Sequence, residues 1–200
     1  MKLLLHACCA PCSVQCVELL DEEGIRPDLF WYNPNIHPYT EYRSRRDSLR
    51  SFAETKGLFL ILDDEYGLRS FTKAVSSIEQ NTSPNENASP GRCAFCYRLR
   101  LEKTAREAAE KGYDAFSTTL LISPYQNHDL IRETGEDMAA RYGILFLYRD
   151  FRPRFRQGQA QAREAGYYMQ KYCGCIYSEE ERYLAVRRHV SGNDASGASL

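Results

Sequence analysis

The chain has 200 residues, of which 43% are hydrophobic and 26% charged, and its formal net charge at pH 7 is −1. This is the composition of a globular domain long enough to bury a substantial core. No apolar run approaches the ~20 residues that a membrane span needs. The nearly neutral net charge gives no indication of a nucleic-acid partner.

Short apolar segments alternate with longer helical patterns along the chain. The expected strands are 3–7, 29–32, 59–62, 115–119 and 144–148. The expected helices are 13–23, 39–56, 96–111 and 126–142, and a glycine follows each, as at many helix C-termini. This alternation predicts an α/β fold with a mainly parallel sheet and flanking helices. Ligands of such sheets bind beyond the carboxyl ends of the strands.

Two polar stretches fall outside the alternation. Residues 79–92 are rich in turn-forming residues, and we expect either a plain surface loop or a lid over a site at Cys93. Residues 191–200 are expected to form a disordered tail, which leaves 1–190 as a single domain. The apolar start of the chain is too short for a signal peptide, so we expect a cytoplasmic protein whose thiols stay reduced.

The eight cysteines carry the strongest chemical signal. Seven of them form a CCxxC, a CxxC and a CxC group, and these are Cys8, Cys9, Cys12, Cys93, Cys96, Cys173 and Cys175. The first group follows the first expected strand and opens a helix, where backbone N–H groups favour thiolate. Cys16 lies one helical turn beyond Cys12 among apolar residues, and we expect it to be a buried core residue.

Dense cysteines in a reducing compartment favour a metal site or redox chemistry over disulfides. A structural zinc site closes with four ligands, commonly from paired CxxC groups, and iron–sulfur clusters also use four cysteines. Seven thiols are too many for one zinc ion and irregular for two. They favour a 4Fe–4S cluster beside a mononuclear metal that has three thiol ligands and an open position, with zinc and a redox dithiol as alternatives.

Polar segments follow two other expected strands. Residues 33–38 contain His37, which suits a helix cap or a substrate contact equally, and they lead to Tyr42. Residues 117–128 offer many hydrogen-bonding side chains, and Ser123 with Pro124 is expected to begin the next helix. Neither GxxxxGK[ST] nor GxGxxG occurs, so a nucleotide cofactor has no support in the sequence.

Three clusters of basic residues stand out in this nearly neutral chain. A single cluster is commonly a solvated helix face, but three together are compatible with a phosphate-binding surface. The clusters are Arg43, Arg45, Arg46 and Arg50; Arg98, Arg100, Lys103 and Arg106; and Arg149, Arg152, Arg154 and Arg156, the last interleaved with Phe151 and Phe155.

Five motifs, in order between about residue 3 and residue 180, carry a resemblance to a known family. They are HACCAPC, YNPNIHPYTEYRSR, GRCAFCYRLRL, FSTTLLISPYQNHDLI and DFRPRFRQGQAQAREAGYYMQKYCGCIYS. Together they resemble the QueH-type epoxyqueuosine reductases. The resemblance implies the fold of adenine nucleotide α-hydrolase-like (HUP) domains, with cysteines in place of the phosphate-binding loop. It also implies reduction of epoxyqueuosine to queuosine in the anticodon loop of a tRNA.

The resemblance further implies a 4Fe–4S cluster beside a mononuclear iron, and an external electron donor. We expect Cys9, Cys93, Cys96 and Cys173 to bind the cluster. Cys8, Cys12 and the other thiol of the CxC group, Cys175, would then hold the single iron, although some family members carry Asp at the position of Cys12. The candidates for proton donation or base contacts are His37, Tyr42, Tyr125 and His128. The arginines are candidates for anticodon-loop phosphates. The competing hypothesis is a zinc-stabilised tRNA-binding protein without redox chemistry.

Overall fold

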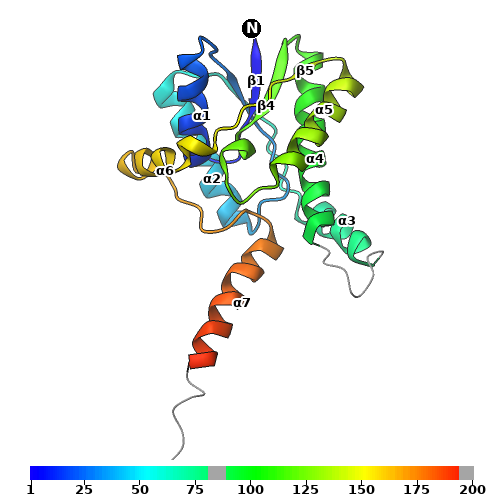
Figure 1. Ribbon diagram of the computed structural model, residues 1–200, viewed down its shortest axis with the longest axis vertical. Coiled ribbons are helices and arrows are strands. Elements are labelled where there is room, and N and C mark those ends of the chain that lie inside the picture. Colours follow the sequence, from blue (N-terminus) through cyan, green and yellow to red (C-terminus); the bar gives the residue numbers. More distant parts are fainter. Residues whose placement is uncertain (81–88, 194–200) are drawn as a thin grey trace, which may run out of the picture.

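Five parallel strands form the centre of the molecule, in the order β3-β2-β1-β4-β5 (Figure 1). The computed structural model describes residues 1–80 and 89–193. The strands are β1 (Leu3–His6), β2 (Asp28–Trp31), β3 (Leu60–Leu62), β4 (Ala115–Thr118) and β5 (Leu145–Phe146). From β1 the chain adds β2 and β3 on one side and then β4 and β5 on the other side. The strand order therefore reverses between β1 and β4. In sheets of this kind the carboxyl ends at such a reversal form the ligand-binding crevice.

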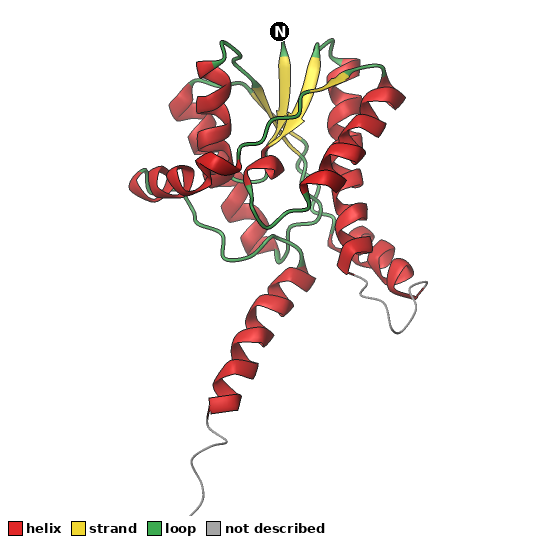
Figure 2. Ribbon diagram, in the orientation of Figure 1, coloured by secondary structure: helices red, strands yellow, loops and turns green. Residues whose placement is uncertain are grey.

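Helices cover both faces of the sheet (Figure 2). α1, α2 and α6 lie on one side, α4 and α5 pack together on the other, and α7 projects away from this body (Figure 1). The helices are α1 (Ala10–Glu22), α2 (Tyr39–Lys56), α3 (Leu68–Gln80), α4 (Ser89–Glu110), α5 (His128–Tyr142), α6 (Phe155–Glu164) and α7 (Ile176–Asn193), with 3-10 turns η1 (Thr119–Ile122) and η2 (Arg152–Arg154). Within the described ranges, no helix combines the length and the apolar character that a membrane crossing needs.

Burial follows from this layering. Every residue of β1 and β4 is buried, because helices cover both sides of the two central strands. The edge strand β3 is only half-buried, and Leu145 of β5 is 56% exposed. The predicted fold class, α/β with a mainly parallel sheet and flanking helices, is confirmed.

Three helix starts differ from the prediction, and the first is that of α1, which begins at Ala10 rather than at Ser13. α4 begins at Ser89 rather than at Cys96, so its CxxC group lies inside the helix; Pro90 falls in the first turn, where a helix tolerates proline. α5 begins at His128, and its cap is Asn127, whose side chain accepts a 3.1 Å hydrogen bond from the backbone N–H of Leu130. The prediction that Ser123 and Pro124 begin this helix is therefore wrong.

The structure describes only part of the two polar stretches. Residues 79–80 end α3 and 89–92 begin α4, whereas 81–88, where the lid was expected, lie outside the described residues. Residues 191–193 end α7, and 194–200 of the expected tail also lie outside the described residues. The single domain over 1–190 remains a prediction.

Candidate metal centre

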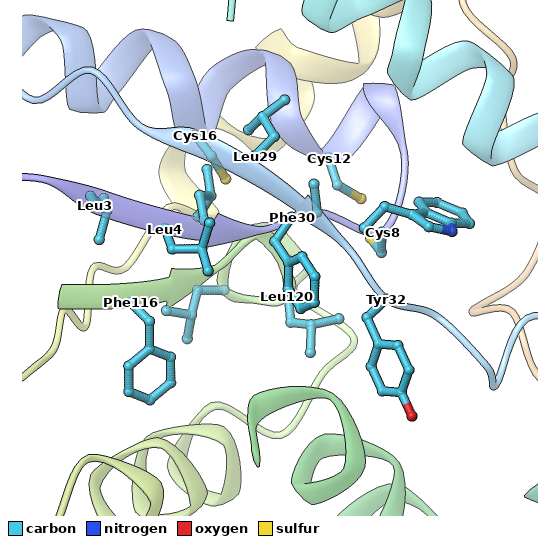
Figure 3. Packing of buried hydrophobic residues seen from close by; sticks show 14 of the residues in the cluster. Leu3, Leu4, Cys8, Cys12, Cys16, Leu29, Phe30, Tyr32, Phe116 and Leu120 are labelled. Carbon is cyan, nitrogen blue, oxygen red and sulfur yellow. The ribbon is translucent and has the colours of Figure 1, made fainter. Parts of the chain in front are cut away.

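The turn between β1 and α1 carries the first three thiols of the site. Cys9 caps α1 with an extended backbone, and Cys12 lies in the first turn of that helix. The Sγ atoms of Cys8, Cys9 and Cys12 lie within 4.8 Å of one another, and all three side chains are buried. Figure 3 shows Cys8 and Cys12 near the carboxyl end of β1 and Cys16 set back along α1. Cys16 is 0% exposed, which confirms that it is a core residue.

The three thiols of this turn differ in how readily they ionise. Hydrogen bonds from Cys12 and Cys9 lower the pKa of Cys8, although burial opposes them. Burial raises the pKa of Cys9, and hydrogen bonding with Cys8 and Cys9 raises that of Cys12. The expectation that this turn favours thiolate therefore applies to Cys8. A metal ion bound by all three sulfurs must displace the protons of the other two.

The adjacent strand ends hold this turn in place. His6 pairs with Thr118 across β1 and β4, and its Nδ1 lies 3.0 Å from the Thr118 hydroxyl. Its Nε2 lies 3.2 Å from the carbonyl of Tyr32; because a carbonyl only accepts, Nε2 carries the proton and Nδ1 accepts. Burial lowers the pKa of His6 to about 4, so the ring is neutral. Beyond β4, the Thr119 hydroxyl accepts a 3.3 Å hydrogen bond from the backbone N–H of Cys8.

The remaining four thiols come together where α4 meets the CxC segment. Cys175 packs against the small apolar cluster that contains Cys96 and Phe71. Burial raises the pKa of Cys93, and raises that of Cys96 to about 12; charges at Cys173 and Cys175 raise both further. These mutual effects on pKa indicate that the four thiols share one region, although the described sulfurs that lie within 4.8 Å of one another are those of Cys8, Cys9 and Cys12.

This grouping differs from the division expected from the sequence. That division placed Cys9 with Cys93 and Cys96, and Cys175 with Cys8. In the structure the sulfur of Cys9 lies beside that of Cys8 at 3.8 Å, because consecutive residues of one tight turn direct both sulfurs to the same place.

Arg45 anchors the CxC segment to α2. Its guanidinium donates 2.9 Å hydrogen bonds to the backbone carbonyls of Cys173 and Tyr172, and its Nε donates to Glu41 at 2.7 Å. Between the two cysteines, Gly174 has φ 146°, and an added Cβ would lie 3.3 Å from the Arg45 guanidinium. A glycine between the two cysteines lets the segment approach Arg45 closely.

Two glutamines connect the thiols to other loops. The amide of Gln126, in the loop after β4, donates to the Cys173 sulfur at 3.5 Å, and that of Gln170 donates to the Cys12 sulfur at 3.4 Å. The oxygen of Gln170 is buried without a hydrogen-bond partner among the described residues, as is that of Asn35, which lies beside the CxC glycine. Buried oxygens without a partner can accept hydrogen bonds from a bound water or from a bound group that has donors.

The charge of Arg100 interacts with thiols of both groups. It is 2% exposed and donates a 3.1 Å hydrogen bond to the Cys96 sulfur. Burial alone lowers the pKa of Arg100, but Cys96, Cys173 and Cys8 raise it above its ordinary value when they are thiolates, the form in which cysteines bind a metal. One buried cation thus faces thiols of both groups. Buried sulfur donors with a compensating cation fit a thiolate-bound iron or zinc centre.

His37 and Tyr42 have structural contacts. His37 is 0% exposed, its Nε2 donates to the Pro34 carbonyl at 3.1 Å, and its ring packs against Tyr66. Burial lowers the pKa of His37 to about 4, so the ring is neutral, and its backbone N–H donates to the carbonyl of Gly174. The Tyr42 hydroxyl donates to Asp64 at 2.8 Å and accepts from the indole of Trp31 at 3.1 Å.

Tyr125 and His128 flank Gln126 in the loop after β4. Tyr125 is 84% exposed, and its ring meets that of Phe155 edge-on. His128 is 8% exposed and donates from Nε2 to the carbonyl of Ser123 at 3.2 Å, which leaves Nδ1 buried without a partner in the described part of the chain.

The structure separates the basic clusters into buried and exposed members. Arg45 and Arg100 are 1% and 2% exposed, so neither can contact a phosphate on the surface; their charges face the CxC segment and the thiols instead. Arg154 is half-buried and pairs with Glu22 at 2.8 Å. The members that are exposed and form no ion pair with any described residue are Arg43, Arg50, Arg106 and Arg156.

Sequence reasoning missed several residues of the site. Arg100 stands four positions after Cys96, a spacing that places two side chains on one face of a helix. That spacing was the available signal for Arg100. Nothing in the sequence distinguishes Gln170, which reaches Cys12 from an irregular segment.

The family model that matches this chain and two similar proteins have the same name. The family model described as epoxyqueuosine reductase QueH matches residues 3–181. The chain is 38% identical over 182 residues to a protein of Dehalococcoides mccartyi named epoxyqueuosine reductase QueH, covering 91% of this chain and 94% of that one. A Thermotoga maritima protein of the same name is 34% identical over 183 residues, covering 90% and 91%.

A solved structure supports the fold alone. It is a predicted subunit of tRNA methyltransferase from Methanocaldococcus jannaschii, with a TM-score of 0.50 and 16% sequence identity, covering 81% of this chain and 75% of that one. The family match spans the three cysteine motifs, of which the first places the sulfurs of Cys8, Cys9 and Cys12 within 4.8 Å of one another after β1. The chain therefore belongs to the epoxyqueuosine reductase QueH family.

Proposed function

We propose that this protein reduces epoxyqueuosine to queuosine in the anticodon loop of a tRNA. The reaction removes the epoxide oxygen, consumes two electrons and two protons, and releases water. The observation that carries the proposal is the match to the QueH family from residue 3 to 181, in a chain whose buried Cys8, Cys9 and Cys12 sulfurs lie within 4.8 Å of one another after β1. We further propose that the protein works in the cytoplasm, where an external donor supplies the electrons.

The two thiol groups support a division of ligands. Cys93, Cys96, Cys173 and Cys175 would hold a 4Fe–4S cluster, which takes four cysteines. Cys8, Cys9 and Cys12 would hold a single iron and leave it an open position. When bound, this centre supplies single electrons and a Lewis-acid position.

Serine substitutions test this division. We expect C96S to lose most iron and acid-labile sulfide, because a cluster ligand is removed, whereas C8S keeps sulfide and loses the iron that is not in the cluster. C16S, which changes a core thiol outside both groups, is the control and should keep the full metal content. Full iron and sulfide in both C8S and C96S would contradict the division.

Three residues near the thiols, Gln170, Asn35 and His128, support the binding of a substrate. The unpaired oxygens of Gln170 and Asn35 can accept hydrogen bonds from hydroxyl groups of a substrate. His128 retains a free Nδ1 near the same loop as Gln126, which makes it our candidate for a proton-handling group. His37 and Tyr42 are proposed to orient the loops around the site, because His37 Nε2 and the Tyr42 hydroxyl bind other parts of the protein. His37 Nδ1, like His128 Nδ1, has no hydrogen-bond partner among the described residues.

Exposed cations and rings support contact with the anticodon loop. Arg43, Arg50, Arg106 and Arg156 are the proposed phosphate contacts, since their charges are not taken up by ion pairs in the described structure. Tyr125 is the proposed stacking partner for an unpaired base.

A nucleoside assay tests the function. Reduced, iron-loaded protein is incubated without oxygen with tRNA that contains epoxyqueuosine, and the digested nucleosides are analysed by mass spectrometry. We expect conversion to a nucleoside lighter by one oxygen atom. Unchanged epoxyqueuosine, together with a colourless protein that contains stoichiometric zinc, would instead support a zinc-stabilised tRNA-binding protein, which the family match does not favour.

A further inference from the structure

Arg100 is an unusual buried cation. It lies on α4 one turn after Cys96, is 2% exposed, and donates from its guanidinium to the Cys96 sulfur at 3.1 Å and from Nε to the Cys96 carbonyl at 3.1 Å. Within residues 1–80 and 89–193, no carboxylate forms an ion pair with it. Burying a guanidinium without a compensating anion is strongly unfavourable.

Arg45 provides an internal comparison. It is equally buried, at 1% exposed, but Glu41 pairs with it at 2.7 Å, and its other donors bind backbone carbonyls. Arg100 has the thiols in place of a carboxylate: besides Cys96, the charges of Cys173 and Cys8 act on it. The fold therefore provides one uncompensated positive charge, and it is directed at the ligands of the proposed centre.

We propose that Arg100 is a positioning residue that raises the reduction potential of the metal centre through its hydrogen bond to Cys96 and its buried charge. The inference rests on the proposed iron–sulfur chemistry. When an external donor passes one electron to the centre, the reduced form carries one more negative charge than the oxidised form, and no bond forms or breaks. A nearby cation in a poorly solvated site stabilises the more negative form, and hydrogen bonds to ligand sulfur act in the same direction.

The test compares reduction potentials of iron-loaded proteins in the absence of tRNA. Wild type, R100M and R100K are titrated anaerobically with dithionite and mediator dyes, while visible absorbance and electron paramagnetic resonance report the reduced cluster. We expect R100M to have a more negative potential than wild type, and R100K, which keeps the charge, to lie between them. R98M is the matched control, because Arg98 lies on the same helix but its side chain is 57% exposed; its potential should equal that of wild type.

Each outcome bears on the proposal. An R100M protein with full iron content and the wild-type potential would overturn it. If R100M alone loses the cluster, the comparison of R100K with wild type decides: a more negative potential in R100K supports the proposal, and an equal potential overturns it. Cluster loss from both R100M and R100K would show that the shape of the side chain matters instead, and would contradict the proposal. If R100M does not fold, R100Q replaces it in the comparison. A wild-type protein that binds no cluster would contradict the proposed function itself.

Discussion

At the scale of single residues, the CxC segment depends on a buried ion pair. Replacing Arg45 by Met leaves Glu41 unpaired and removes two hydrogen bonds to the carbonyls of Tyr172 and Cys173. We expect R45M to lower the free energy of unfolding by about 3–5 kcal/mol and to reduce cluster iron, because breaking a buried pair leaves an uncompensated charge. Denaturant unfolding and iron analysis measure the two effects.

Arg43 gives the matched control for this prediction. It lies on the same helix, is exposed and forms no ion pair with a described residue, so R43M should change the free energy of unfolding by less than about 0.5 kcal/mol. Equal destabilisation by R45M and R43M would show that the buried pair does not hold the CxC segment.

Tyr125 is the residue whose exposure most favours a contact with RNA. The ring of Tyr125 is 84% exposed, so it contributes little to the stability of the free protein. It lies in the loop from which Gln126 reaches Cys173. We expect Y125A to weaken tRNA binding by about 1–3 kcal/mol and Y125F to retain most of the affinity, because stacking uses the ring rather than the hydroxyl. Binding curves for the three proteins decide this; wild-type affinity in Y125A would remove Tyr125 from the interface.

At the scale of elements, the contact of α5 with β5 is tight at Gly135. A Cβ at this position would overlap the ring of Phe146, which is only 8% exposed and so has little room to move. We expect G135A to lower the free energy of unfolding by about 1–3 kcal/mol, although alanine favours a helix. The double variant G135A/F146L, with a smaller side chain facing the helix, should recover part of the loss. A stabilised G135A would contradict the packing seen here.

The elements differ in how well the sequence predicts them. α2 has the predicted bounds because its periodicity ends at Gly57, a left-handed C-cap. The start of α5 was misplaced because Ser123 and Asn127 are both good caps, and only the tertiary path after β4 selects Asn127. Helices α3, α6 and α7 were not predicted. α3 and α6 each have a marked apolar face, so their periodicity was an available signal, whereas that of α7 is weak.

The site shows a similar limit. The spacing of the cysteines predicted the close group of Cys8, Cys9 and Cys12, whereas the part that the other four thiols play stays a prediction. The contact of Cys96 with Cys175 could not be read from the sequence, because these residues meet only through the fold. Arg45 and Arg100 looked like surface cations, since arginine is seldom fully buried. Their burial depends on partners that are remote in the sequence, namely the carbonyls of the CxC segment and the thiols around α4.

At the scale of the whole molecule, metal loading should depend on pH. Burial raises the pKa of Cys93, and that of Cys96 to about 12, so the metal-free protein holds these two thiols protonated near neutral pH. Metal binding must then release protons, and the apparent affinity should rise with pH. Competition with a chelator at about pH 6 and about pH 8 measures this. C16S should show the wild-type dependence, and a pH-independent affinity would indicate that the thiols are already ionised before binding.

The central claim is that two thiol groups, one of three residues and one of four, form a single reductive metal centre at the carboxyl edge of the sheet. The most direct measurement is the Mössbauer spectrum of protein loaded anaerobically with isotopically enriched iron. We expect two components in this spectrum, one from a 4Fe–4S cluster and one from a separate mononuclear iron, and we expect C8S to lose the second. A spectrum with only one kind of iron site, or the same two components in C8S, would contradict the claim.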